Sequence, residues 1–291
     1  MEKIFDKALQ AKLHEIFRFA IELIEKKGLS YWTCGGTTLG AVRHKNIIPW
    51  DDDIDIYMPR EDYEKLMADR QELLGTKYRL FTLGDKGYSS PFAKLVDINT
   101  SWWETKKVPL VLGVFVDIFP LDFFDWSKEM ITKEQYKSSR LYYRYYYTLC
   151  NFSHEEYWAL FKGFHFGDLY RKLSAKLYSS EKALRLLLEQ EKKMAKANGH
   201  KYCVCFTQWE GRIFDAEWFD GYTSCDFNDY SVRNPKNSDS YLKLLYGDYM
   251  KLPPEDKRVS QHNQFYVNLK EHLSVEEILN RLEKGEQNII Y

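Results

Sequence analysis

Several features that define common protein classes are missing from this chain of 291 residues. No apolar run approaches the roughly 18 residues that a membrane-spanning helix needs. Charges interrupt the first 28 residues throughout, unlike a secretory signal. The formal net charge is −1, so there is no overall basic field of the kind that binds nucleic acid. These absences predict a cytoplasmic protein without a nucleic-acid partner.

Cysteine is also scarce. The five cysteines are an odd number and are scattered along the chain, which argues against a disulfide framework. Cys203 and Cys205 alternate with Val204, and His200 and Cys225 lie nearby in the sequence. A zinc site could be built from the thiols and the imidazole, but their spacing matches no common zinc motif. We therefore expect reduced, buried thiols.

The pattern along the chain predicts an α+β fold, with a mixed sheet flanked by helices and a largely helical additional region. The expected strands are 31–34, 51–57, 78–83, 92–98 and 111–119. The expected helices in the first half are 4–27, one that starts at Thr37, and 59–74. A helical stretch begins at residue 126, and its last helix runs from Ser180 to Gly199. A further helix ends at Gly247, and another starts at Ser274, with Glu277 in a capping box. We divide the chain into residues 1–125, 126–200 and 201–291.

One acidic segment stands out, because four carboxylates occupy the five positions from Asp51 to Asp55. In a strand Asp51, Asp53 and Asp55 would share one face, about 6.6 Å apart from one to the next. Two carboxylates at that distance repel by about 2–3 kcal/mol at an effective dielectric constant near 20. A structural strand gains nothing from this repulsion, whereas a hard cation such as Mg²⁺ converts it into binding energy. The alternative is a solvated turn after Pro49.

Two further motifs fit a site of this kind. Gly35-Gly36-Thr37-Thr38 lies between an expected strand and an expected helix, where a phosphate can approach the backbone and the helix N-terminus. Asp117 is the one carboxylate in the apolar stretch 114–119, and a buried carboxylate is costly unless it is hydrogen-bonded or bound to a metal. Metal ligation and hydrogen bonding to the neighbouring backbone both remain open for Asp117.

These motifs together resemble the LicD/fukutin family of the nucleotidyltransferase superfamily. The strongest likeness lies in residues 35–44 (GGTTLGAVRH) followed by residues 48–55 (IPWDDDID). It continues through 92–97 (FAKLVD), 115–122 (FVDIFPLD), 246–249 (YGDY), the Pro253-Pro254 pair and Arg258. The helical stretch 126–200 contributes little to it. The resemblance implies a nucleotidyltransferase-like catalytic core in residues 1–125, completed by residues 201–291.

The family moves phosphocholine or a phosphosugar alcohol from a CDP-activated donor to a sugar hydroxyl. The resemblance implies that Asp53, Asp55 and Asp117 are catalytic and hold Mg²⁺ or Mn²⁺, with Asp51 as an additional ligand. Donor phosphates would be bound by residues from the glycine turn and by three basic side chains, namely Gly35, Gly36, Thr37, Thr38, Arg43, Lys94 and Arg258. The alternative for Arg43 and Lys94 is a solvated surface charge.

Aromatic residues make up 16% of the chain. A choline head group would require an aromatic cage, for which we name Trp102 and Trp209, although aromatic side chains also simply fill cores. Between residues 137 and 178 there are seven basic and three acidic residues, a balance of +4. Such a face would suit a lipid-linked glycan at the inner face of the membrane; an ordinary helical hairpin is the alternative.

The leading hypothesis is a metal-dependent transferase that moves phosphocholine from CDP-choline to a cell-envelope glycan, such as a teichoic acid precursor or a lipopolysaccharide-type sugar, and releases CMP. A nucleotidyl or phosphoalditol transferase would use the same carboxylates. A non-catalytic choline- or glycan-binding protein would need only the aromatic surface.

Overall fold

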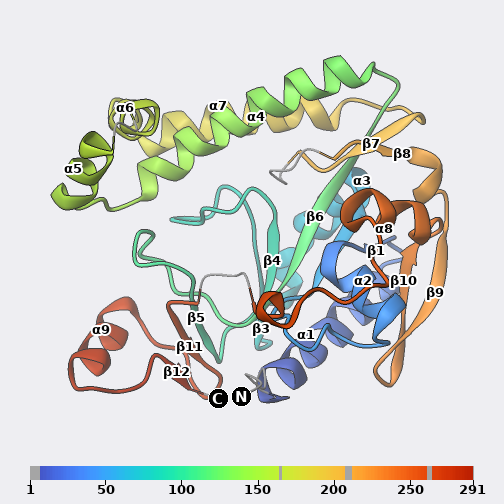
Figure 1. The fold of residues 1–291 in the computed structure, drawn as a ribbon, viewed down its shortest axis with the longest axis horizontal. Helices are drawn as coiled ribbons and strands as arrows, with labels where there is room; N and C mark the ends of the chain where they lie inside the picture. The colour runs from blue at the N-terminus through green and yellow to red at the C-terminus, as the bar shows by residue number, and fades with distance from the viewer. Residues whose placement is uncertain (1–6, 164–165, 207–211, 261–263, 291) are drawn as a thin grey trace.

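A mixed sheet supports the site, with the strand order β1 (Trp32–Thr33), β2 (Asp55–Pro59), β6 (Phe115–Phe124), β4 (Ala93–Asp97) and β3 (Tyr78–Phe81). The computed structural model describes residues 7–163, 166–206, 212–260 and 264–290 (Figure 1). Strands β2 and β6 run parallel, whereas β1, β4 and β3 join the sheet in antiparallel pairs. The far end of β6 pairs with β7 (Tyr202–Val204), and β7 pairs with β8 (Phe214–Asp215).

The two faces of this sheet are covered by different cores. Ile56 and Ile118 pack in a cluster with residues of α1 (Lys7–Lys26), whose apolar stripe includes Phe17. Tyr57 and Phe119, on the opposite face, pack in a second cluster with residues of the C-terminal part. Because side chains alternate along a strand, the odd-numbered residues of β2 and β6 share the face that lies away from α1. Asp55 and Asp117 are therefore on that face.

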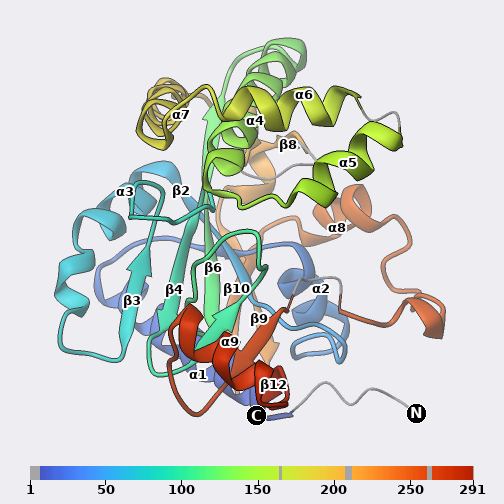
Figure 2. The ribbon, with the colours of Figure 1, turned by 90° about the vertical axis from the view of Figure 1, so that its left-hand side faces the viewer.

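A layer of helices lies over one end of the sheet (Figures 1 and 2). It contains α4 (Lys128–Leu149), α5 (His154–Lys162), α6 (Phe166–Ala175) and α7 (Ser180–Ala195), with α4 packed along α7 and α6. Helix α3 (Arg60–Ala68) follows β2 directly and leads into the short 3-10 helix η1 (Arg70–Leu73).

The remaining elements surround the sheet on its other sides. A hairpin of β9 (Tyr222–Phe227) and β10 (Tyr230–Pro235) lies beside β1, and α2 (Gly35–Arg43) contacts α8 (Ser238–Tyr246). A separate sheet joins β5 (Ser101–Trp103), β11 (Tyr266–Asn268) and β12 (Ile289–Ile290), next to α9 (Val275–Glu283) in the sequence. The short 3-10 helices η2 (Ala216–Phe219) and η3 (Glu255–Lys257) lie in the connections.

The predicted α+β class is confirmed, as are several helix ends. Ser274 and Glu277 form the capping box of α9, and Gly247 ends α8 with a φ of +65°. The division of the chain at residues 125 and 200 stays a prediction. Within the described residues, no helix is both long enough and apolar enough to cross a bilayer.

Some predicted boundaries are wrong. Helix α2 begins at Gly35 rather than Thr37, and the helix predicted over 59–74 ends at Ala68. Gly199 does not end α7, which stops at Ala195. Instead Gly199 lies against the backbone of β6, where a Cβ atom would overlap Phe124. Its lack of a side chain therefore serves close backbone packing rather than helix capping.

A buried ion network connects the helical layer to the sheet. Arg60 at the start of α3 donates to both carboxylate oxygens of Asp122 on β6, over 2.7 and 2.8 Å, and to Glu191 on α7 over 3.2 Å. Burial raises the pKa of Glu191 to about 6, although the Arg60 guanidinium acts in the opposite direction. One cation therefore holds two carboxylates from different layers.

The raised pKa of Glu191 predicts a pH-dependent stability. The native carboxyl keeps its proton to a higher pH than the unfolded chain does, so its contribution to stability falls as the pH rises through about 6. We expect Glu191→Gln to become more stable relative to the wild type by about 1–2 kcal/mol between pH 4.5 and pH 7. Urea unfolding at both pH values measures this. The exposed Glu189→Gln is the control, and a Glu191→Gln profile parallel to the wild type would contradict the prediction.

Candidate active site

Asp55 lies where three elements meet. Its carbonyl oxygen accepts a hydrogen bond from Cys34 N over 3.1 Å, and its backbone N donates to the Thr37 hydroxyl over 2.8 Å. On the other side, Asp55 is the register partner of Asp117 in the parallel pair of β2 and β6, about 4.8 Å away between the strands. The structure thus brings the glycine turn, the acidic segment and the later acid to one place.

Asp117 makes an ion pair with Lys94, its register partner on β4. Lys94 Nζ lies 2.8 and 3.1 Å from the two oxygens of Asp117, and 3.4 Å from Glu104 Oε1. The ammonium also lies 3.3 Å from the centroid of the Phe115 ring. Burial alone would lower the pKa of Lys94, but the carboxylates of Asp117 and Glu104 outweigh it and raise the pKa. The lysine predicted to bind phosphate is therefore a buried cation that neutralises Asp117.

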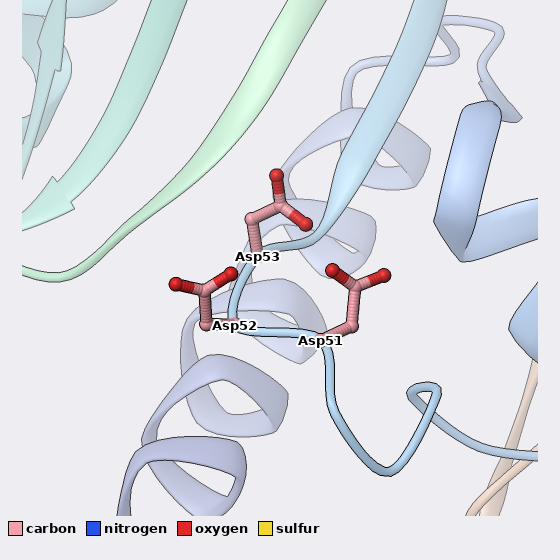
Figure 3. A group of neighbouring side chains, drawn as sticks. All are labelled: Asp51, Asp52 and Asp53. Carbon is pink, nitrogen blue, oxygen red and sulfur yellow. The ribbon is translucent and has the colours of Figure 1, made fainter. Parts of the chain in front are cut away.

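The acidic segment is not a strand over its first four residues. Asp51, Asp52 and Asp53 precede β2, which begins only at Asp55, because the pairing with β6 begins there. The predicted alternation of the acids along a strand is therefore wrong for these three. Instead the three side chains project from one bend of the chain and lie close together (Figure 3). One carboxylate oxygen from each lies within 4.8 Å of the others. Asp52 joins this group although the alternation pattern would place it on the opposite face.

The glycine turn leaves room for one of these carboxylates. A Cβ atom on Gly36 would lie 2.5 Å from Asp51 Oδ2, and one on Gly35 would lie 3.7 Å from Asp55 Oδ2. Gly35 also has a φ of +51°, a conformation that favours glycine. Thr37 supports the backbone of Asp55, and the buried Thr38 hydroxyl contacts Thr33 over 2.9 Å. The two glycines thus face the acids, whereas the two threonines hold the local structure.

Two cavities meet at the acids. The first, of about 870 Å³, is lined by the glycine turn, by Asp51 and Arg43, and by the C-terminal part with residues such as Tyr246. The second, of about 510 Å³, is lined by the Lys94–Asp117 pair and by tyrosines of α4. The lining residues common to both cavities are Asp53, Asp55, Phe92 and Phe119. A molecule that spans both cavities would therefore pass the carboxylates of Asp53 and Asp55.

Basic side chains gather at the first cavity. Arg43 lines it and donates to the Tyr249 carbonyl over 2.6 Å, while burial lowers the pKa of its guanidinium. Arg258 lies beside the cavity, donating to the Pro253 carbonyl over 2.9 Å, with its guanidinium 5.8 Å from the Trp50 ring centroid. No sequence motif indicated the three further basic lining residues, Arg212, Lys251 and Lys257.

The predicted aromatic cage is only partly in place. Trp102 lines the second cavity, but it is 3% exposed and packs edge-on against the Phe115 ring at 5.3 Å. Trp209 lies outside the described residues. The aromatic residues that sequence reasoning missed are Tyr142, Tyr143 and Tyr146 of α4, which line the same cavity. Only their position in a tyrosine-rich run pointed to them.

The donor atoms suit a hard divalent cation. Carboxylate oxygens are the ligands that Mg²⁺ and Mn²⁺ prefer, and the Gly36 position leaves the Asp51 carboxylate the space that a side chain would fill. Among the described residues, the group with ligand spacing is the one formed by Asp51, Asp52 and Asp53. The five cysteines are free thiols. Neither they nor His200 belong to this group of acids.

The geometry agrees with comparisons to known proteins. Residues 28–161 match the LicD/FKTN/FKRP nucleotidyltransferase domain. This part of the chain is a nucleotidyltransferase domain of the LicD/fukutin family. It is 29% identical over 271 residues to the lipopolysaccharide cholinephosphotransferase LicD of Haemophilus influenzae, a match that covers 91% of this chain and 98% of that protein.

Two other relatives match shorter stretches of the chain. An uncharacterised protein of Rickettsia typhi is 33% identical over 128 residues, which is 43% of this chain and 38% of that protein. The ribitol 5-phosphate transferase FKRP of Mus musculus is 46% identical over 50 residues, covering 17% of this chain and 10% of that protein.

The close approach of Gly36 to Asp51 yields a prediction. In Gly36→Ala the new methyl group must displace the Asp51 carboxylate, which lies at the end of a movable side chain. We expect a change in unfolding free energy within about 1 kcal/mol, but a loss of about tenfold in Mn²⁺ affinity.

Calorimetric titration of Mn²⁺ measures this effect. Gly167→Ala on α6, where a Cβ atom meets nothing within 4 Å, is the matched control. Unchanged Mn²⁺ affinity in Gly36→Ala would show that Asp51 is not a ligand.

Proposed function

We propose that this protein is a metal-dependent transferase that moves phosphocholine from CDP-choline to a hydroxyl of a cell-envelope glycan and releases CMP. The match to LicD over 91% of the chain supports transfer of a phosphocholine or phosphoalditol group in general. The observation that carries the proposal is the meeting of two cavities at Asp53 and Asp55. Transfer of a phosphoryl group requires that donor and acceptor are held next to each other, and a junction of two cavities can hold them so.

The first cavity suits the nucleotide half of the donor. Arg43, Lys251 and Lys257 bring positive charge to it, and the first turn of α2 offers its helix dipole. A divalent ion held by the group of Asp51, Asp52 and Asp53, with Asp55 lining the same cavity as Asp51 and Asp53, would neutralise the pyrophosphate and the leaving CMP. Gly35 and Gly36 would let the phosphates approach the backbone.

The attacking hydroxyl would enter from the second cavity. Its oxygen would form the new bond to the choline-side phosphorus as the bond from that phosphorus to the CMP oxygen breaks, with entering and leaving oxygens in line. The proton of the hydroxyl would pass to Asp55, because this carboxylate lines both cavities and lies outside the group with metal-ligand spacing. Asp117 is less suited to this role, because both of its oxygens accept hydrogen bonds from Lys94.

The acceptor is proposed only as a class: a glycan, free or lipid-linked, of the teichoic acid or lipopolysaccharide type. A lipid-linked acceptor would require work at the inner face of the membrane. Exposed apolar residues of α5 and α6, such as Trp158 (60% exposed) and Tyr170 (73% exposed), are compatible with such peripheral contact.

The test is incubation of the purified chain with CDP-choline, Mg²⁺ and an amino-sugar glycan. We expect release of CMP and an acceptor whose mass grows by one phosphocholine. Growth by a nucleotide would instead identify a nucleotidyl transferase, and absence of CMP release would count against the proposal.

A substitution at Asp55 gives the matching prediction. Asp55→Asn keeps the shape of the side chain but removes a charge where the two cavities meet. We expect kcat to fall by about 10³-fold, which corresponds to about 4 kcal/mol of transition-state stabilisation. The control is Asp226→Asn on the exposed part of β9, which should behave as the wild type. Equal rates for the two variants would remove the carboxylate from the mechanism.

A further inference from the structure

We infer that the second cavity is the binding site for the quaternary ammonium of the donor, with the tyrosines of α4 as its aromatic wall and Glu104 as its counter-charge. This inference rests on the proposed function, because it assigns one end of the proposed donor to a place. Apart from Trp102, the aromatic residues of this cavity were not part of the predicted cage.

The two cavities differ in the charged residues that line them. The first cavity is lined by four acids and four bases: Asp51, Asp53, Asp55, Asp248, Arg43, Arg212, Lys251 and Lys257. The second is lined by five acids and one base: Asp52, Asp53, Asp55, Glu104, Asp117 and Lys94. An anionic nucleotide is favoured where the bases are, and an organic cation is favoured where the acids dominate. The proposed donor carries negative charge on its pyrophosphate and positive charge on its choline end.

The second cavity is also rich in aromatic side chains. Phenylalanines, tyrosines and one tryptophan make up a large part of the wall of the second cavity: Tyr88, Phe92, Trp102, Phe115, Phe119, Tyr142, Tyr143 and Tyr146. A quaternary ammonium has no N–H group to donate, so ring faces and diffuse negative charge are what recognise it. One ring of this wall already binds a cation, because Lys94 Nζ lies 3.3 Å from the centroid of Phe115.

Two of these aromatic rings, both on α4, lie close to each other. Tyr142 and Tyr146 are one helical turn apart, with ring centroids 6.0 Å from each other and planes inclined by 32°. Burial raises the pKa of both hydroxyls, and the nearby carboxylate of Glu104 adds to it. Both rings are therefore neutral phenols in the wall of the cavity.

Glu104 supplies a negative charge outside the acid group at the junction. Its side chain is 41% exposed, and its Oε1 atom lies 3.4 Å from Lys94 Nζ, farther than the 2.8 Å between Lys94 and Asp117. Two carboxylates, Asp117 and Glu104, thus surround one ammonium, and the remaining negative charge attracts a second cation. A cavity of about 510 Å³ has space for a head group and for the hydroxyl of an acceptor.

The experiment measures binding and kinetics in Glu104→Gln and Tyr146→Leu. We expect the Kd of CDP-choline, from titration calorimetry, and its KM to rise about tenfold, while the Kd of CMP and the kcat stay within about twofold. Tyr146→Phe, which keeps the ring, should bind as the wild type does. The controls are the exposed Glu155→Gln on α5 and Tyr170→Leu on α6. Unchanged Kd and KM for CDP-choline in both test variants would overturn the inference.

The cation that binds in the second cavity could be the choline of the donor or an amino sugar of the acceptor, and inhibition experiments distinguish the two. Tetramethylammonium that competes with CDP-choline supports the inference, whereas competition only with the glycan acceptor overturns it, because the cavity would then bind an amino sugar. The proposed function can fail alone: a wild type that binds CDP-choline through Glu104 but releases no CMP keeps the head-group site and loses the reaction. Conversely, an active enzyme indifferent to both substitutions keeps the reaction and loses the site.

Discussion

The parallel pairing of β2 with β6 is the constraint on which the rest of the site depends. It places Asp55 beside Asp117 on the face of the sheet that lies away from α1. Two carboxylates so close repel each other, and the structure offsets this with the buried Lys94 ammonium on the third strand. Because the α2 hydroxyl of Thr37 accepts a bond from Asp55 N, the glycine turn is fixed relative to the same strand.

From this pair the site extends in two directions of opposite character. Toward α2 and the C-terminal part, bases balance the acids, and the space suits a phosphorylated nucleotide. Toward β4, β5 and α4, acids and rings predominate. The polarity of the proposed donor would match this difference, with its reactive phosphorus at the boundary. No single element provides this arrangement, since the lining residues come from nearly the whole length of the chain.

The sequence predicted the elements and the central acids better than it predicted their surroundings. Asp53, Asp55 and Asp117 stood out because charge inside an apolar pattern is costly, and such costs are visible locally. Asp52 was missed because the strand pattern assumed a pairing that begins only at Asp55. The positions of Lys94, Tyr142 and Tyr146 at the second cavity depend on which side chains meet across strands and layers, and single-sequence patterns carry no such information.

The attachment of α4 has a consequence for how such enzymes can diversify. The tyrosine-bearing helix belongs to a layer that Arg60 ties to the sheet through Asp122 and Glu191, away from the reactive acids. Its inner surface can therefore be exchanged without disturbing the β2–β6 pair or the glycine turn. A chimaera that carries the α4 segment of a relative would test whether substrate preference is a portable property of that helix, inherited separately from the chemistry.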